Sequence, residues 1–182
     1  MLDSFGRSID YLRISVTDRC NLRCFYCMPE EGIELLKHEA ILSYEAITQV
    51  AQKAVKLGFT KIRLTGGEPL IRKNIVDLVA MLSNISGIKT IAMTTNGTLL
   101  SDLAQELKNA GLTSINVSLD TMNSTLYNII TRGGSLDAVL KGIYAAKNAG
   151  LAIKINTVVL DTASPILAEQ KFSKIKFLKN YQ

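Results

Sequence analysis

The stretch Leu57-Gly-Phe-Thr-Lys-Ile-Arg-Leu-Thr65 decides the fold. The segment before it, 44–57, has the spacing of an amphipathic helix, and Gly58 is typical of a helix C-terminus. Ile62 and Leu64 then alternate with polar residues, which predicts a strand with one apolar face. A helix that ends on glycine and passes directly into a strand indicates a repeating βα unit.

The same junction occurs twice more, at Ala110-Gly111 and at Ala149-Gly150. Strand patterns and helix patterns alternate along the rest of the chain, and this alternation predicts an α/β fold with a parallel sheet. The predicted strands are 11–17, 61–64, 89–95, 114–119 and 152–160. The predicted helices are 44–57, 75–82, 103–109 and 136–148, with Ser43, Ser101 and Ser135 as N-caps.

Most of these strands place polar residues on one face. Arg13, Arg63 and Lys154 lie on these polar faces, which would meet inside a curved sheet. A buried cation requires a bound anion or an acidic partner, so three of them indicate a polyanionic substrate. The alternative is that they pair with Glu68 and Asp120 or lie at exposed strand ends.

All three cysteines fall in Cys20-Asn-Leu-Arg-Cys24-Phe-Tyr-Cys27, directly after the first predicted strand. An odd number at close spacing favours metal binding in a reducing compartment over disulfides. Loops at the carboxyl ends of strands are where α/β folds bind ligands. Three thiolates can hold a four-iron cluster in which one iron has no protein ligand and is free to bind a small molecule. The alternative is a structural zinc site formed by the three cysteines and His38, the single histidine.

Three further motifs close the following strands. In Thr65-Gly-Gly-Glu-Pro69 the glycines allow close approach to a ligand, and Glu68 is expected to be available to a cation. Thr94-Thr-Asn-Gly97 and Ser118-Leu-Asp120 supply hydroxyl and amide groups at the same rim. Each motif alone is typical of a tight turn, and together they outline a pocket.

The cysteine spacing, with Tyr26 as the aromatic residue before the last cysteine, resembles the signature of the radical S-adenosylmethionine (SAM) superfamily. The resemblance implies that Cys20, Cys24 and Cys27 hold a [4Fe-4S] cluster whose open iron binds SAM for reductive cleavage. The Gly-Gly-Glu-Pro motif is similar to the one that contacts the SAM amino group. The implied fold is a partial (β/α) TIM-like barrel of parallel strands, incomplete at the C-terminus, over 1–160, followed by a divergent basic tail at 161–182.

Longer stretches resemble the GTP 3',8-cyclases, the molybdenum cofactor biosynthesis protein A family within that superfamily. They are Asp10–Gly32, Lys61–Leu70, Met93–Gly97, Asn116–Asp120 and Lys154–Val159. The resemblance implies a lyase that cyclises GTP to (8S)-3',8-cyclo-7,8-dihydroguanosine 5'-triphosphate, the first step of molybdenum cofactor biosynthesis. By matching position, Tyr26, Gly67 and Ser118 would contact SAM, and Arg13, Arg63, Thr94 and Lys154 would contact GTP.

The family also has a C-terminal part with a second cysteine triad, whereas this chain has no cysteine after Cys27. The second cluster is therefore not encoded here, and we expect a truncated, frameshifted or divergent form whose activity stays open. The resemblance further implies a reductant such as flavodoxin, a downstream cyclic pyranopterin monophosphate synthase and a homodimer.

The formal net charge of +5 and the pI near 9.1 fit an anionic ligand as well as a solvated surface. The sequence shows no leader and no apolar run of membrane-spanning length, so we expect a cytoplasmic protein without membrane contact. Nucleic acid is not an expected partner. Two alternatives stay open: a different radical SAM enzyme, and a noncatalytic metal-binding or nucleic-acid-binding module that uses the basic tail.

Overall fold

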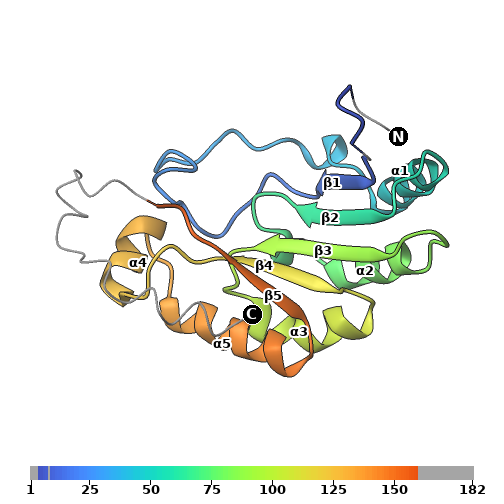
Figure 1. Ribbon diagram of the computed structural model, residues 1–182. Helices are drawn as coiled ribbons and strands as arrows, with labels where there is room; N and C mark the ends of the chain where they lie inside the picture. The colour runs from blue at the N-terminus through green and yellow to red at the C-terminus, as the bar shows by residue number, and fades with distance from the viewer. Residues whose placement is uncertain (1–3, 8, 160–182) are drawn as a thin grey trace.

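Five parallel strands form one sheet in the order β1-β2-β3-β4-β5 in the computed structural model (Figure 1), which describes residues 4–7 and 9–159. The strands are β1 (Tyr11–Ser15), β2 (Lys61–Thr65), β3 (Thr90–Thr95), β4 (Ser114–Ser118) and β5 (Ala152–Asn156). All five were predicted, and the α/β fold is confirmed. The predicted tail, 161–182, and its boundary lie outside the described residues.

Helical segments connect each strand to the next. They are η1 (His38–Ala40), α1 (Tyr44–Lys56), η2 (Pro69–Ile71), α2 (Ile75–Ser83), α3 (Leu100–Asn109), α4 (Ser124–Thr131) and α5 (Leu136–Asn148). The glycines at 58, 111 and 150 follow α1, α3 and α5 with φ of 94°, 109° and 74°. They therefore end these helices in the left-handed region that glycine adopts readily.

Two of the three predicted N-caps are confirmed. The hydroxyl of Ser43 accepts a hydrogen bond from Ala46 N at 3.2 Å, and the hydroxyl of Ser135 accepts one from Ala138 N at 3.4 Å. The prediction for Ser101 was wrong, because α3 begins at Leu100 and its N-cap position is Leu99. The apolar face of α3 includes Leu100, which is fully buried, so packing rather than a side-chain cap sets where this helix begins.

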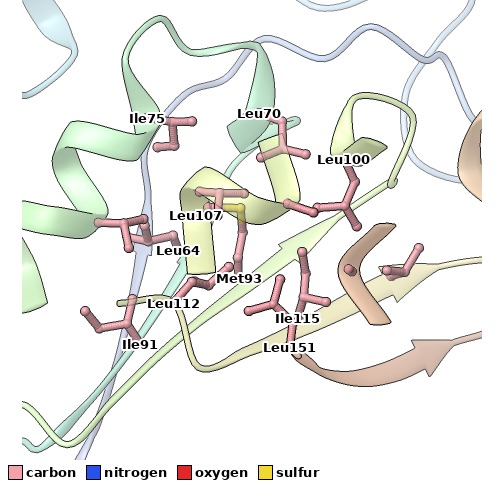
Figure 2. Packing of buried hydrophobic residues seen from close by; sticks show 14 of the residues in the cluster. Leu64, Leu70, Ile75, Ile91, Met93, Leu100, Leu107, Leu112, Ile115 and Leu151 are labelled. Carbon is pink, nitrogen blue, oxygen red and sulfur yellow. The ribbon is translucent and has the colours of Figure 1, made fainter. Parts of the chain in front are cut away.

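The hydrophobic core lies between the helices and one face of the sheet. Ile62, Leu64 and Met93 extend from the strands toward the helices, and each is at most 1% exposed. Figure 2 shows Met93 beside Leu107 of α3 in this core. Burying apolar surface stabilises the fold by roughly 25 cal/mol per Å², so this single-sided core fixes which strand residues face away from it.

The opposite face carries the polar residues and is open. Arg13 and Lys154 are exposed and Arg63 is half-buried, so the expectation of three buried cations was wrong. The physical reason is that β1 and β5 lie at the two edges of the described sheet, which does not close on itself. The fold is thus an incomplete (β/α) barrel. None of the described helices is long and apolar enough to cross a lipid bilayer.

Candidate functional site

The predicted motifs gather at one edge of the sheet. Because all five strands are parallel, the segments that follow them emerge on the same side. These segments are the cysteine loop (20–27) after β1, residues 66–69 after β2, residues 96–98 after β3 and residues 119–120 after β4. Figure 1 shows the cysteine loop, in blue, on the side where the strand arrows end. The sequence therefore predicted correctly which segments meet.

The cysteine loop is compact and its thiols are free. Cys27 N and Met28 N both donate to the carbonyl of Cys24, at 2.8 and 3.1 Å, and close a tight turn. The Sγ atom of Cys20 accepts a hydrogen bond from Leu22 N at 3.4 Å. Cys20 and Cys24 are half-buried and Cys27 is exposed, so all three thiols lie at the protein surface or just below it.

The C-terminal end of α4 supports the cysteine loop from outside. Arg23 N donates to Thr131 O at 3.1 Å, and Phe25 N donates to Ile130 O at 3.0 Å. The side chain of Arg132, just beyond α4, donates to the carbonyls of Arg23 and Met28 at 3.1 and 3.0 Å. The first two bonds use carbonyls that the end of α4 leaves without intrahelical partners, and the other two use carbonyls of the loop. Together the four bonds attach the loop to the body of the fold.

Sequence reasoning missed both α4 and Arg132. Asn123 is the N-cap of α4, and its side-chain oxygen accepts from Leu126 N at 2.9 Å. Leu126 and Ile130 are buried at i, i+4 spacing and form a separate small apolar cluster. A capping residue followed by this spacing was a readable signal, although eight residues are few for a helix pattern.

Gly66 and Gly67 pack against the backbone that leads into the cysteine loop. Gly67 N donates to Thr17 O, and Glu68 N donates to Arg19 O, both at 2.7 Å. A Cβ atom at Gly67 would lie 2.5 Å from the carbonyl carbon of Arg19 and closer still to its oxygen. The glycines were predicted to allow close approach to a ligand. In the structure they allow close approach to the backbone of Thr17 and Arg19.

Glu68 is buried, with 1% of its surface exposed. Its carboxylate accepts hydrogen bonds from Thr95 Oγ1 at 2.6 Å, Asn96 N at 2.6 Å and Leu70 N at 2.9 Å. Burial raises the pKa of this carboxyl, and the three hydrogen bonds oppose that rise. The expectation that Glu68 is available to a cation was wrong, because its oxygens already join the segments after β2 and β3.

Tyr26 joins the cysteine loop to the end of β4. Its hydroxyl donates to Asp120 Oδ2 at 2.6 Å, and Asp120 Oδ1 accepts from Val158 N at 2.9 Å. Burial, followed by this bond to the Asp120 carboxylate, raises the pKa of Tyr26. Among the described residues, neither Asp120 nor Glu68 forms the ion pair with Arg13, Arg63 or Lys154 that was the alternative for these cations. Ser118, the last residue of β4, is half-buried.

The four residues predicted to contact GTP form a continuous band across the polar face. Arg13 and Arg63 are opposite one another in the β1–β2 register. The Arg63 guanidinium donates to the hydroxyl of Tyr11 and, at 3.3 Å, to that of Thr94. Thr94 is in register with Asn116, and Asn116 is in register with Lys154. The strands thus bring together all four predicted residues.

The three thiols suit an iron–sulfur cluster by their chemistry. Burial, followed by the nearby charges of Asp120, Cys20 and Cys27, raises the pKa of Cys24 to about 11. Neighbouring negative charges disfavour the thiolate form of each cysteine. Binding to positively charged iron between the thiols would compensate for this repulsion. No three His, Cys, Asp or Glu side chains within 4–7 and 9–159 converge on a single ion, so a Cys3His zinc site with His38 is not formed there. Cluster ligands bind separate irons and need no such convergence.

Comparison with known proteins identifies the family. The radical SAM superfamily model matches residues 14–165. The GTP 3',8-cyclase of Peptoclostridium acidaminophilum is 57% identical over 161 residues, which is 88% of this chain and 50% of that protein. The GTP 3',8-cyclase of Geobacter sulfurreducens is 53% identical, over 88% of this chain and 49% of that protein. The chain spans about half the length of the curated relatives it matches.

Solved structures share the fold at low identity. Streptococcus suis SuiB bound to its precursor peptide SuiA superposes with a TM-score of 0.75 at 21% identity, covering 94% of this chain and 36% of that one. Methylornithine synthase (PylB) superposes with a TM-score of 0.67 at 21% identity, covering 90% of this chain and 50% of that one. The family match covers most of the chain and includes all three cysteines. The chain therefore belongs to the radical SAM superfamily.

Proposed function

We propose that this chain is the N-terminal part of a GTP 3',8-cyclase, with a [4Fe-4S] cluster on Cys20, Cys24 and Cys27. The observation that carries the proposal is that the cysteine loop lies at the edge of the same sheet whose polar face carries Arg13, Arg63 and Lys154. The identity of 50–57% with relatives of that name supports the choice of GTP as substrate. The chemistry that cluster and SAM supply when bound is one-electron cleavage of SAM to methionine and a 5'-deoxyadenosyl radical.

The residues around the cysteine loop orient SAM in this proposal. Tyr26 is part of the loop, and its side chain is fixed by its hydrogen bond to Asp120. Gly67 is exposed and its backbone carbonyl would accept from the SAM amino group, and Ser118 would supply a hydroxyl at the end of β4. A carbonyl suits an amino group, and a hydroxyl suits a ribose, so these three groups match the polar parts of SAM.

The cationic band binds the triphosphate. Arg13 and Arg63 lie at equivalent positions on adjacent strands, which are about 4.8 Å apart, so their like charges repel until an anion lies between them. The hydroxyls of Tyr11 and Thr94 hold the Arg63 guanidinium in place, ready for bidentate contact with phosphate oxygens. Lys154, on β5, extends the band toward the far edge of the sheet.

The chemistry supplied at this site would be removal of a hydrogen atom from the GTP ribose, which leads to the cyclised nucleotide. A reductant of the flavodoxin class and a downstream cyclic pyranopterin monophosphate synthase belong to this proposal, as do a homodimer and a cytoplasmic location. The chain covers half of its relatives, so whether it cyclises GTP without further protein is part of the test.

Anaerobic reconstitution of the 182-residue chain with iron and sulfide, followed by reduction with SAM, tests the proposal. We expect an iron–sulfur absorption band and 5'-deoxyadenosine, and binding of GTP that weakens in Arg63→Gln. Cys24→Ser is the matched control for the cluster, and Lys141→Gln, on the exterior of α5, is the control for lost positive charge. If wild type forms no cluster or leaves SAM intact, the proposal fails. If 5'-deoxyadenosine forms but GTP does not bind, a different radical SAM substrate is indicated.

A further inference from the structure

The side chain of Asn96 reaches from the end of β3 into the cysteine loop. Its Nδ2 atom lies 3.9 Å from Cys20 Sγ and 2.8 Å from Asn21 Oδ1, and donates to both. The first contact is within the distance at which an amide donates to sulfur. Asn96 is therefore a polar side chain from outside the cysteine loop that touches a predicted ligand atom.

The orientation of this amide is fixed by its neighbours. Asn96 Oδ1 accepts from Thr98 N at 3.0 Å and from Thr98 Oγ1 at 2.7 Å. A backbone N–H can only donate, so the oxygen must face Thr98 and the nitrogen must face Cys20. The backbone of Asn96 is held as well, because its N–H donates to the buried Glu68 carboxylate at 2.6 Å.

We propose that Asn96 is a positioning residue that tunes the cluster through a hydrogen bond to the Cys20 thiolate. This inference rests on the proposed function, because it requires a cluster on Cys20. A hydrogen bond to a cluster sulfur stabilises the reduced state more than the oxidised state, because reduction adds one electron and increases the negative charge on sulfur. The amide of Asn96 thus raises the reduction potential and makes it easier for a reductant to deliver that electron.

Glu68 contributes to this arrangement indirectly. It is buried between the segments after β2 and β3, and it holds the backbone of Asn96 at the position from which the amide reaches Cys20. The Gly-Gly-Glu-Pro motif is therefore also connected to the cysteine loop, through Asn96. Glu68 and Cys20 are linked through two hydrogen bonds of Asn96, of 2.6 and 3.9 Å.

Asn96→Asp and Asn96→Ala test the proposal together. Aspartate keeps an oxygen for Thr98 and removes the N–H donor, but it also adds a charge, whereas alanine removes the donor without a charge. Asn21→Asp adds the same charge next to Asn96 and leaves the Asn96 amide in place. Asn148→Ala, at the exposed end of α5, controls for loss of an asparagine elsewhere.

The readout is an EPR-monitored redox titration of the reconstituted chain without SAM or GTP. We expect a more negative midpoint in both Asn96 variants, with roughly tenfold less reduced cluster at a fixed potential, and 59 mV corresponds to tenfold for a one-electron couple. Asn21→Asp should shift the midpoint less than Asn96→Asp. An Asn96→Ala midpoint equal to that of Asn148→Ala overturns the inference, and so does an Asn21→Asp shift that matches Asn96→Asp.

A measurement on wild type covers the case in which Asn96 variants bind no iron. Pulsed EPR of reduced wild type that carries ¹⁵N-labelled asparagine side chains should show nitrogen coupling to the cluster, and absence of coupling overturns the inference. This failure differs from failure of the proposed function. A wild-type chain without a cluster overturns the proposed function and this inference with it, whereas an unshifted midpoint or absent coupling overturns the inference alone.

Discussion

Replacing Gly67 with alanine tests whether the Gly-Gly-Glu-Pro motif holds the cysteine loop before any ligand binds. The residue packs against the backbone of Arg19, and an added Cβ would lie 2.5 Å from the carbonyl carbon there. Atoms of this kind rest about 3.5 Å apart, so the two backbones must separate by about 1 Å. A separation of that size stretches the two hydrogen bonds that join the motif to Thr17 and Arg19, both 2.7 Å long.

The expected cost follows from those two bonds. Each backbone hydrogen bond contributes about 1 kcal/mol net, and a buried group left without a partner costs about 1–3 kcal/mol. We therefore expect Gly67→Ala to lower the free energy of unfolding by about 2–4 kcal/mol. This is a large part of the total stability of an ordinary domain, which is about 5–15 kcal/mol.

Chemical denaturation of the metal-free chain measures this cost, and Gly133→Ala is the matched control. A Cβ at Gly133 meets nothing within 4 Å, so that substitution carries only the strain of its φ of 111°. The reasoning is refuted if Gly67→Ala is no more destabilising than Gly133→Ala in the absence of cofactor. Such a result would mean that the glycine is needed only for contact with SAM.

Three further substitutions test single interactions. Burial raises the pKa of Glu68, so its stabilising contribution is present below the unfolded pKa of about 4.3 and is lost as pH rises through the folded pKa. The stability difference between wild type and Glu68→Gln should therefore fall from about pH 4 to neutral, and a difference independent of pH would contradict the raised pKa. Arg132→Gly removes the side-chain bonds to the cysteine loop while relieving a φ of 52°, so hydrogen exchange should quicken at 23–28 without loss of global stability. Tyr26→Phe should cost about 1 kcal/mol, and a double-mutant cycle with Asp120→Ala should show coupling unless their 2.6 Å bond contributes nothing.

The strands and most helices could be predicted because their apolar periodicity is regular. Ile62 and Leu64 alternate cleanly, and the glycines after α1, α3 and α5 mark where helices end. The start of α3 could not be predicted from a capping residue, because burial of Leu100 determines it. The family resemblance implied an incomplete barrel, but the exposure of Arg13 and Lys154 escaped the argument from strand patterns, since alternation in a strand says nothing about whether its sheet closes.

Candidate site residues were predictable as types and positions but not as contacts. The cysteine spacing and the motifs at the strand ends indicated which segments would meet, and the parallel sheet brings them together. The burial of Glu68 could not be read from the sequence, because two of its three donors, Thr95 and Asn96, are 27 and 28 residues away. For the same reason the approach of Asn96 to Cys20, across 76 residues, had no local signal.

The two parts of the proposed site differ in how completely this chain forms them. The cysteine loop and the residues that lead into it are held by the segments after β2, β3 and β4 and by the end of α4, and all of these contacts lie within 17–132. The cationic band instead ends at Arg13 and Lys154, which are exposed on the two edge strands. Exposed cations bind a phosphate weakly, because water screens their charge. SAM cleavage should therefore persist under conditions of high salt in which GTP binding to this chain is lost.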